Sequence, residues 1–452
     1  MKNLITCLTV CVLSGAALAT TWTVDDDGKA DFDNIYLAVA AASDGDVILV
    51  MEGTYYSSYI NPHGKAILVE GEINSKGELL VTVDGMQSGA ILECYSGEGA
   101  DTVFRNLILT NGSSYYGGGM TLFDGSSPTV ENCIFRNNTG TIEGGGIHLR
   151  ENCNPIIINC RFEDNFASGP GGGMFCMENS NPTIQNCTFM GNTANDGGGI
   201  YCSQSSPTIT GSTISSNMAT SGGGVFCINN SSPTITDSTI SSNTTFFGGG
   251  GIYSRGGTCN PMVTNCTIEG NTSKNYGGGF FSHFNSSPTF SGCTISGNAA
   301  TLGGGVYCES NSSPTLTGCD IANNSATQGG GIYLTVSSPT ITQCLIMGNT
   351  AVDFGGGVNC YYISNPVITD TVLCSNTPNH FFGSWVDNGG NTIADVCQCT
   401  ADINGDGYVD VSDLLTIIDQ WGLTNSPADV NDDGIVDVSD LLIVISNWGP
   451  CE

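Results

Sequence analysis

The strongest constraint on the fold of this chain is a unit of about 26 residues that recurs ten times between residues 117 and 376. Each unit holds a run of glycines, a proline, and an asparagine ten residues after that proline. The glycine runs occupy 117–119, 144–146, 171–173, 197–199, 222–224, 248–251, 277–279, 303–305, 329–331 and 355–357. The asparagines are Asn138, Asn165, Asn192, Asn217, Asn243, Asn271, Asn298, Asn324, Asn349 and Asn376. An offset that holds in all ten units predicts a repeat architecture, with loops in the segment of variable length between each asparagine and the next proline.

Short strands are the expected structure of each unit. Apolar residues alternate with polar ones, as in Pro207-Thr208-Ile209-Thr210, which is the period of a β-strand. Proline and glycine recur every few residues and exclude long helices. A unit this short cannot bury a core by itself, so it must stack on its neighbours. The expected fold class is therefore all-β, a parallel β-helix solenoid whose coils lie ~4.8 Å apart.

Stacking would place equivalent residues of successive units in columns. One cysteine column lies five residues after the proline and contains Cys133, Cys160, Cys187, Cys266, Cys293, Cys319 and Cys344. A second, three residues after the glycine run, contains Cys176, Cys202, Cys227, Cys308 and Cys360. The asparagines form a third column, in which stacked amides can hydrogen-bond to one another. Three interpretations of the cysteines remain open: small apolar core residues, disulfides between coils, or thiolate ligands of a metal ion.

The repeats resemble those of right-handed parallel β-helix proteins of the pectate-lyase-like superfamily. The segments Gly144-Gly-Gly-Ile147 and Phe135-x-x-Asn138 are also similar to the repeats of polymorphic outer-membrane proteins, found in bacterial surface adhesins. The resemblance implies a right-handed solenoid whose regular repeats span 116–390.

Residues 20–115 are expected to form the N-terminal cap and the first coils of this solenoid. Within them, the pattern at 33–42 predicts a short amphipathic helix, and residues 47–51 predict a strand. A helix at this place would cover the exposed edge of the first coil.

Two acidic segments, 27 residues apart, follow the repeats. In each, oxygen-bearing side chains occupy positions 1, 3, 5, 9 and 12 of a loop with glycine at position 6, and position 7 offers a backbone carbonyl. The expected ligands are Asp402, Asn404, Asp406, Tyr408, Asp410 and Asp413 in the first loop and Asp429, Asn431, Asp433, Ile435, Asp437 and Asp440 in the second. A calcium ion takes about six to eight oxygens around a sharp turn, and no lysine or arginine accompanies these acids. The sequence therefore predicts two bound calcium ions.

Each loop runs into an apolar segment, 414–421 or 441–448, with the spacing of a short helix. A loop with one following helix, and with Asp instead of Glu at position 12, resembles the type I dockerin repeat. This resemblance implies a dockerin-like calcium-binding domain at 401–452, after a linker at 391–400. It also implies a partner, a cohesin-like domain or a cell-surface anchor. Pairing of Cys397 or Cys399 with Cys451 would clasp the domain, and free surface thiols are the alternative.

An export signal is expected at the N-terminus. Lys2, an apolar stretch at 4–13 and the small residues Ala17 and Ala19 match a signal peptide at 1–19. No later segment is long and apolar enough for a membrane span, so the mature chain is expected to be secreted or held at the cell surface. The formal net charge of −32 excludes nucleic acids as partners, because phosphates require a basic surface. Divalent cations, cationic surfaces and neutral glycans are the partners that suit this composition, and a polysaccharide is one such glycan.

A catalytic centre is not evident in the sequence. The best acid pair is Glu151 with Glu178, each five residues after its glycine run. Coil stacking would bring these two near the ~5 Å separation of retaining glycosidases. His63, His283 and His380 carry no ligand or triad pattern. Aromatic residues beside glycine runs, such as Tyr115-Tyr116, suit either sugar stacking or capping of the coils.

Three functions remain open. The first is a binding, adhesion or carbohydrate-interacting module without chemistry, attached to a partner through the calcium-dependent dockerin. The second is a polysaccharide lyase or glycoside hydrolase carried into a multi-enzyme assembly by the same domain. The third is a purely structural surface filament. Few cations and no evident catalytic cluster favour the first.

Overall fold

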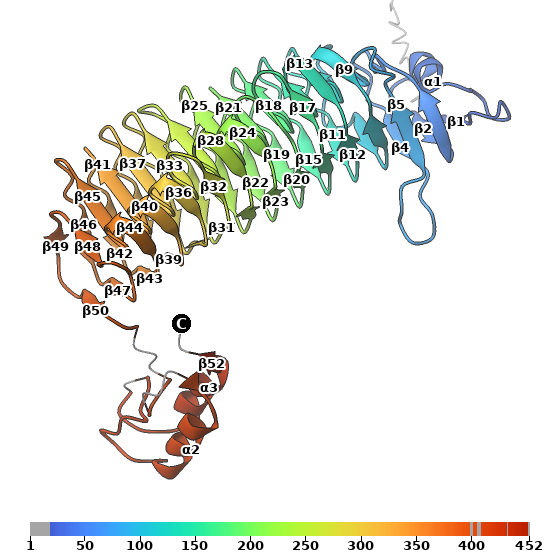
Figure 1. The fold of residues 1–452 in the computed structure, drawn as a ribbon. Helices are drawn as coiled ribbons and strands as arrows, with labels where there is room; N and C mark the ends of the chain where they lie inside the picture. The colour runs from blue at the N-terminus through green and yellow to red at the C-terminus, as the bar shows by residue number, and fades with distance from the viewer. Residues whose placement is uncertain (1–18, 398–400, 405–407, 432, 451–452) are drawn as a thin grey trace, which may run out of the picture.

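The protein winds as a long parallel solenoid that is followed by a small helical module (Figure 1). This computed structural model describes residues 19–397, 401–404, 408–431 and 433–450. Residues 1–18 of the predicted signal peptide, and the predicted ligand Asp406, lie outside the described residues. The expectation of an all-β parallel solenoid is confirmed, because every strand pair of the solenoid sheets is parallel and joins one coil to the next.

Two long sheets run along the solenoid, and we call them sheets A and B. Sheet A contains β1 (Thr21–Val24), β2 (Val47–Val50), β4 (Leu68–Gly71), β7 (Val103–Arg105), β11 (Thr129–Glu131), β15 (Ile156–Ile158), β19 (Thr183–Gln185), β22 (Thr208–Thr210), β26 (Thr234–Thr236), β30 (Met262–Thr264), β34 (Thr289–Ser291), β38 (Thr315–Thr317), β42 (Thr340–Thr342), β46 (Val367–Thr369) and β49 (Val386–Asp387). Sheet B contains β3 (Gly53–Tyr56), β5 (Val81–Asp84), β8 (Ile108–Thr110), β12 (Ile134–Arg136), β16 (Arg161–Glu163), β20 (Thr188–Met190), β23 (Thr213–Ser215), β27 (Thr239–Ser241), β31 (Thr267–Glu269), β35 (Thr294–Ser296), β39 (Asp320–Ala322), β43 (Leu345–Met347), β47 (Val372–Cys374) and β50 (Thr392–Ala394).

The other two sides of the coil are sheet C and a shorter fourth side. Sheet C contains β6 (Leu92–Cys94), β10 (Met120–Leu122), β14 (Ile147–Leu149), β18 (Met174–Met177), β21 (Ile200–Ser203), β25 (Val225–Ile228), β29 (Ile252–Arg255), β33 (Phe280–His283), β37 (Val306–Glu309), β41 (Ile332–Thr335), β45 (Val358–Tyr361) and β48 (Phe381–Phe382). The fourth side contains β9 (Ser113–Tyr116), β13 (Thr139–Glu143), β17 (Phe166–Ala167), β24 (Met218–Ser221), β28 (Thr244–Gly248), β32 (Thr272–Ser273), β36 (Ala299–Leu302), β40 (Ser325–Gln328) and β44 (Thr350–Phe354).

The glycine runs turn the chain from the fourth side into sheet C. Gly197 has φ +63°, a left-handed conformation that glycine adopts without steric cost. Its neighbour Gly198 needs glycine for a different reason. A Cβ there would lie 2.7 Å from the carbonyl oxygen of Gly223 in the next coil. Each run therefore combines one turn with a close approach between coils.

The core is a stack of apolar side chains that point inward from three sheets. Phe135, Phe162 and Phe189 of sheet B lie face to face, with ring centroids 4.9 and 4.4 Å apart along the column. A second apolar cluster lies on the outer face of sheet C. It contains Phe226, Tyr253, Phe281, Tyr307 and Tyr333, with Tyr276 and Leu302 packed against them. These aromatic side chains are buried against one another, whereas Tyr115 of the predicted aromatic pair is exposed.

The asparagine column is a continuous hydrogen-bonded ladder inside the solenoid. The side-chain amide of Asn217 donates to Oδ1 of Asn243 at 2.9 Å, and the backbone N–H of Asn217 donates to the same oxygen at 3.0 Å. Asn243 repeats both bonds to Asn271. Each of these three side chains is buried. The predicted ladder is confirmed, and it satisfies backbone groups that the turns leave without a strand partner.

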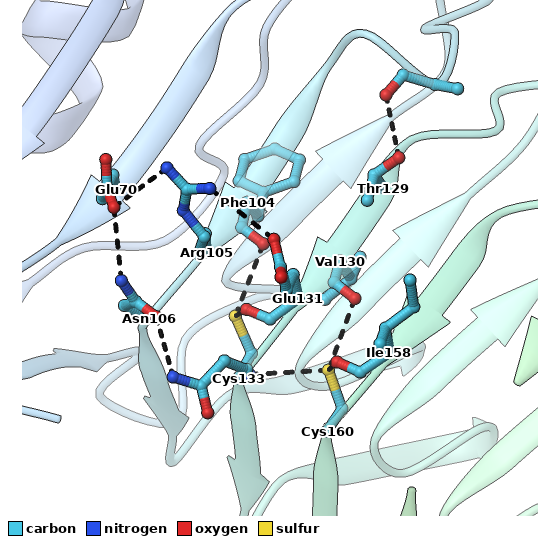
Figure 2. A network of polar contacts seen from close by, with 12 residues as sticks. Glu70, Phe104, Arg105, Asn106, Thr129, Val130, Glu131, Cys133, Ile158 and Cys160 are labelled. Atoms are coloured by element: carbon cyan, nitrogen blue, oxygen red, sulfur yellow. Dashed lines mark hydrogen bonds and ion pairs between the residues drawn. The ribbon is translucent and has the colours of Figure 1, made fainter. Parts of the chain in front are cut away.

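The cysteine columns are also confirmed, and they hold buried thiols. The backbone N–H of Cys133 points at the sulfur of Cys160 in the next coil, at 3.5 Å (Figure 2). Fifteen described cysteines are free and all of them are buried, which favours the interpretation as small core residues. The described residues contain one disulfide, Cys374–Cys397. The predicted pairing of Cys397 with Cys451 is therefore wrong, while Cys399 and Cys451 lie outside the described residues.

A short helix covers the first coil, as predicted. This helix, α1 (Ile35–Ala41), begins after Asn34, whose side chain accepts a hydrogen bond from the N–H of Tyr36. Its buried face is Ile35, Ala38 and Val39. The ammonium of Lys65 donates to the carbonyl oxygens of Val39 and Ala42 at the end of the helix, where the helix dipole favours a cation.

The solenoid continues into the segment for which the sequence predicts a linker. Strand β50 lies inside that segment and pairs with β47 of the preceding coil. The disulfide Cys374–Cys397 joins the same two coils. The module beyond it contains α2 (Val411–Asp419), α3 (Val438–Ser446), and the antiparallel pair β51 (Tyr408–Val409) and β52 (Gly449–Pro450). Its small core is Ala401, Val409, Ile417, Ala428, Val436 and Val444.

Candidate functional site

A cleft of about 600 Å³ lies near the N-terminal end of the solenoid. Its lining comes from α1, from the end of β3 and from the turn after β5. The lining residues are Asn34, Tyr36, Leu37, Tyr56, Ser57, Ser58, Tyr59 and Met86. Tyr59 also lines a second cleft of about 300 Å³, together with Gly89, Ser113, Ser114, Tyr115 and Thr141. The two hollows therefore share a tyrosine, and we call them together the tyrosine cleft.

The tyrosines of this cleft present their rings to solvent. Tyr56 is 64% exposed and Tyr115 is 70% exposed. Tyr59 is held in place because its hydroxyl donates to the carbonyl oxygen of Ser88 at 3.1 Å. Its φ of 60° is in the left-handed region, as is the φ of 54° at Met86.

No lining residue of the tyrosine cleft is charged, although the chain contains 42 acidic residues. Aromatic rings with neighbouring hydroxyl and amide groups offer an apolar platform and hydrogen bonds, and an uncharged site does not attract ions. The cleft therefore suits a neutral, hydroxyl-rich ligand. Tyr115 is the one residue of the cleft that the sequence analysis identified as a sugar-stacking candidate.

A second candidate site is a column of ionisable side chains on sheet C. Arg255, His283 and Glu309 occupy the same register in three successive strands, β29, β33 and β37. The hydroxyl of Tyr253 lies 3.0 Å from Nδ1 of His283, and Nε2 of His283 lies 3.9 Å from Oε2 of Glu309. We call these three ionisable residues the Arg–His–Glu column.

The surroundings of this column change its acid–base properties. Burial lowers the pKa of His283 to about 4, and the nearby Arg255 guanidinium lowers it further in the same direction. The imidazole also stacks on Phe284, with ring centroids 3.8 Å apart. Burial raises the pKa of the Tyr253 hydroxyl. At neutral pH the imidazole is therefore uncharged and can accept a hydrogen bond from the Tyr253 hydroxyl.

This column was not predicted from the sequence, because each histidine was considered alone. A signal was available: Arg255, His283 and Glu309 each lie four residues after the last glycine of their run. Equal offsets in successive units predict neighbours in space, by the same reasoning that predicted the cysteine columns.

The two acids of the predicted pair, Glu151 and Glu178, have different surroundings. Glu178 is held by Arg150, whose Nε and Nη2 donate to the two carboxylate oxygens at 3.0 and 2.9 Å. Glu151 is exposed. His148 is fully buried and stacks on Phe175 at 4.9 Å, and burial lowers its pKa. Because the Arg150 guanidinium occupies both carboxylate oxygens, this geometry does not favour Glu178 as the acid that protonates a substrate.

The predicted calcium loops fold around their own carboxylates. In the second loop, Asp429 accepts hydrogen bonds from the N–H groups of Asp433 and Gly434 at 3.2 and 2.9 Å. The side chain of Asn431 accepts from the N–H of Asp433 at 2.9 Å. Ile435 donates its N–H to Asp433 at 3.2 Å. Four of the predicted ligands thus lie within one tight turn.

The last two acids of each loop also shape the following helix. Asp410 and Asp437 accept hydrogen bonds from Ser412 and Ser439 and cap α2 and α3. This cap starts each helix three residues before the predicted apolar segment.

At position 12 of the loops, Asp413 and Asp440 are fully buried. Oδ1 of Asp440 accepts from the N–H groups of Val430 and Asn431, and its Oδ2 accepts from Asp437. Asp413 makes the equivalent bonds to Ile403, Asn404 and Asp410.

The predicted ligand atoms of these loops are of the chemical type that a hard cation binds. The described ligands are carboxylate, amide and carbonyl oxygens, and residues 401–450 contain no lysine or arginine to balance the acids. Asp402, Asn404 and Tyr408 also have interaction partners. Among the described residues, no three His, Cys, Asp or Glu side chains already converge as a metal site. A carboxylate has about four lone-pair sites, so Asp440 keeps capacity on Oδ2 beside its backbone bonds.

Both helices of the module carry an exposed apolar stripe. On α2 the stripe is Val411, Leu415 and Ile418, and on α3 it is Val438, Leu442 and Ile445, each between 52% and 59% exposed. These six residues occupy equivalent positions in the duplicated units. Such faces mark sites of protein association more often than free surface.

Comparison with known proteins places the solenoid in a family. Residues 80–240 and 198–373 match the family model described as right handed beta helix region. No curated protein matches the chain. No helix among the described residues has the length and apolar character needed to cross a membrane.

Three solved structures are similar to this chain. A periplasmic alginate epimerase is 13% identical, with 78% of this chain and 76% of that chain covered and a TM-score of 0.39. A pectate lyase is 11% identical, with coverages of 91% and 87% and a TM-score of 0.35. A mannuronic-acid-specific polysaccharide lyase of family 6 from human gut microbiota is 12% identical, with coverages of 82% and 92% and a TM-score of 0.36. Similarity at this level carries no argument about substrate or activity.

Proposed function

Because the chain belongs to the right-handed β-helix family, we propose that it is an exported module that binds a neutral polysaccharide in the tyrosine cleft. The observation that carries this proposal is the uncharged, tyrosine-rich lining of the two hollows that share Tyr59. Sugar rings present flat apolar faces edged by hydroxyls, which match aromatic platforms beside serine and asparagine. An acidic polysaccharide would find no cation in this lining.

The test is binding of the purified protein to neutral glucans, xylans and mannans, with alginate and polygalacturonate as acidic comparisons. We expect binding to at least one neutral polymer. Tyr56→Ala and Tyr115→Ala should each weaken it about tenfold, which corresponds to ~1.4 kcal/mol. The matched control is Tyr362→Ala, because Tyr362 is 75% exposed and lies outside the cleft. Failure to bind every neutral polymer, or an equal loss in the Tyr362 variant, would refute the proposal.

We further propose that the C-terminal module attaches the chain to a cohesin-like domain when calcium fills its two loops. When bound, calcium would neutralise the clustered carboxylates and fix the loops from which α2 and α3 start. The exposed stripes on the two helices support this docking role. Their equivalence predicts that Leu415→Asp or Leu442→Asp alone leaves capture of a cohesin domain largely intact, whereas the double variant abolishes it. Capture that survives removal of calcium would contradict the proposal.

The Arg–His–Glu column favours a second function, cleavage of an acidic polysaccharide. An uncharged imidazole with a tyrosine hydroxyl at 3.0 Å can move a proton, and Arg255 would offset the charge of a neighbouring sugar carboxylate. Incubation with alginate or polygalacturonate should then release unsaturated ends, and His283→Gln should abolish that release. If the wild-type protein releases none, this second function fails and the binding proposal remains to be judged on its own experiment.

A further inference from the structure

The outward side of sheet A changes character along the solenoid. In the early coils, Glu70, Arg105 and Glu131 occupy one outward column. Arg105 pairs with both acids, at 3.0 and 3.7 Å (Figure 2). Beyond Ile158 and Gln185, the same column carries only hydroxyl side chains as far as Thr369.

We call the hydroxyl-bearing part of sheet A the threonine face. Its first column contains Thr183, Thr208, Thr234, Met262, Thr289, Thr315 and Thr340, and its second contains Thr210, Thr236, Thr264, Ser291, Thr317 and Thr342. All of these side chains are partly or well exposed. The inward residue between the two columns is fully buried in every strand, as in Ile209, Ile235 and Leu316.

This face is a regular two-dimensional lattice. The strands pair in one continuous register without a bulge between β19 and β42. Hydroxyls therefore recur about every 4.8 Å along the solenoid and about every 6.6 Å along each strand. Threonine is stiff at χ1 because its Cβ is branched, and the buried neighbours fix the backbone. One bond between hydroxyls of the lattice joins Thr210 to Thr236 at 3.1 Å.

The side chains of the threonine face limit the classes of ligand that it can bind. None of its side chains is charged or aromatic, although the chain holds 42 acids and 37 aromatic residues, counted as 4 Trp, 15 Tyr and 18 Phe. A mineral surface would be recognised by carboxylates, and sugar rings would be held by aromatic platforms such as those of the tyrosine cleft. What remains is a ligand that offers hydroxyl-type donors and acceptors with the same two-dimensional period.

We propose that the threonine face adsorbs to ice. The faces of hexagonal ice present water oxygens in a regular two-dimensional array, and one of its repeats is close to the ~4.8 Å spacing between coils. Each threonine hydroxyl can donate one hydrogen bond to lattice water and accept others, and its methyl group occupies the hollow between waters. A single contact of this kind is weak, but a rigid array makes many at once and orders no flexible side chain in doing so.

Met262 supplies an internal test, because it is the one position of the first column that lacks a hydroxyl. It is 54% exposed, so Met262→Thr changes the surface and not the core. This substitution should strengthen ice adsorption. Tyrosines placed by Thr236→Tyr and Thr317→Tyr should instead hold the face away from the ice and reduce adsorption at least fivefold.

The experiment is slow growth of an ice front into a solution of the full-length protein, with measurement of the fraction incorporated and of the depression of the freezing point. Thr244→Tyr with Thr350→Tyr is the matched control, because both residues are exposed and lie on the fourth side of the coil. We expect wild-type incorporation well above that of a non-binding protein, a gain in Met262→Thr, a loss in the tyrosine pair on the threonine face, and no change in the control pair. Circular dichroism verifies that each variant is folded.

Two results would overturn the proposal. One is rejection of the wild-type protein from ice to the same extent as the non-binding protein. The other is sedimentation with microcrystalline cellulose that the Thr236 and Thr317 variants lose while ice incorporation stays unchanged, because the face would then recognise a crystalline polysaccharide. Variants of the tyrosine cleft should leave ice incorporation unaffected, so this proposal and the proposed sugar binding fail independently.

Discussion

The solenoid and the C-terminal module are both made of duplicated sequence, but they use duplication in opposite ways. In the solenoid, each asparagine amide bonds to its copy in the next coil, as Asn243 does to Asn271, so every unit depends on its neighbours. In the module, each buried carboxylate bonds to its own loop, as Asp440 does to Val430 and Asn431. The two copies share a small apolar core, and the strand pair β51–β52 joins the first copy to the end of the second.

This difference separates two sources of stability. A solenoid coil gains from burial and hydrogen bonds that continue along the whole molecule, so its stability is a sum over neighbouring units. The module has few buried apolar residues and clustered acids, which is typical of domains that need a bound ion to fold. Perturbations should therefore act on one region and spare the other.

The largest expected effect is loss of the module on removal of calcium. Binding at two sites, each at a hundredfold excess of calcium over its Kd, would stabilise the module by about 5 kcal/mol. A chelator should therefore abolish a low-temperature unfolding transition and leave the solenoid transition in place.

Differential scanning calorimetry with and without the chelator measures this directly. In the tryptophan fluorescence, Trp421 and Trp448 report on unfolding of the module, and Trp22 and Trp385 report on unfolding of the solenoid. Restored calcium should restore the transition. Identical calorimetric traces in both conditions would show that calcium does not stabilise the module.

A smaller effect is expected from a single break in the asparagine ladder. Asn243→Leu removes the acceptor of two Asn217 donors and leaves the carbonyl oxygen of Ile214 without its side-chain partner. Unsatisfied buried groups cost about 1–3 kcal/mol each, so we expect a loss of about 4 kcal/mol from the solenoid alone. The adjacent exposed Thr244→Ala serves as the control. If urea unfolding gave the two variants the same stability, the ladder would not be what joins the coils.

The smallest expected effect is a pH dependence confined to the solenoid. The pKa of His283 is lowered to about 4 in the folded protein, whereas an unfolded histidine has a pKa near ~6.5. Between these values the unfolded chain binds a proton that the folded chain does not, so stability falls as the pH is lowered from about 7 to 4.

With allowance for solvent at the edge of the ring, this contribution is roughly 2 kcal/mol. Thermal unfolding of His283→Gln should show a shallower decline over that range than the wild type. His63→Gln, at an exposed position, should keep the wild-type slope. The module contains no histidine, so its unfolding transition should lack the pH dependence that histidine causes. Parallel slopes in all three proteins would contradict the assignment.

Much of the fold followed from fixed offsets, because a period in the sequence becomes a column in space. Asn138 to Asn376 and the cysteine columns were predictable for that reason. The same argument, applied to Arg255, His283 and Glu309, would have found the second candidate site.

The tyrosine cleft had no such signal. Tyr36, Tyr56 and Tyr59 come from the cap and first coils, which follow no repeat, so only the folded backbone shows that they converge. The pairing of Cys374 with Cys397 was missed for a related reason. The last coil continues through residues that read as a linker, and there it brings the two Cα atoms to 4.8 Å.

The number of parallel coils also sets the length of the solenoid. Its two candidate attachment points belong to opposite ends of the chain, with the cleft at the first coils and the helical module after the last. The 14 strands of sheet B span roughly 60 Å at the usual spacing between strands. Gain or loss of one repeat in evolution changes that reach by a single step of about 4.8 Å without disturbing either end, so spacing can be selected independently of affinity.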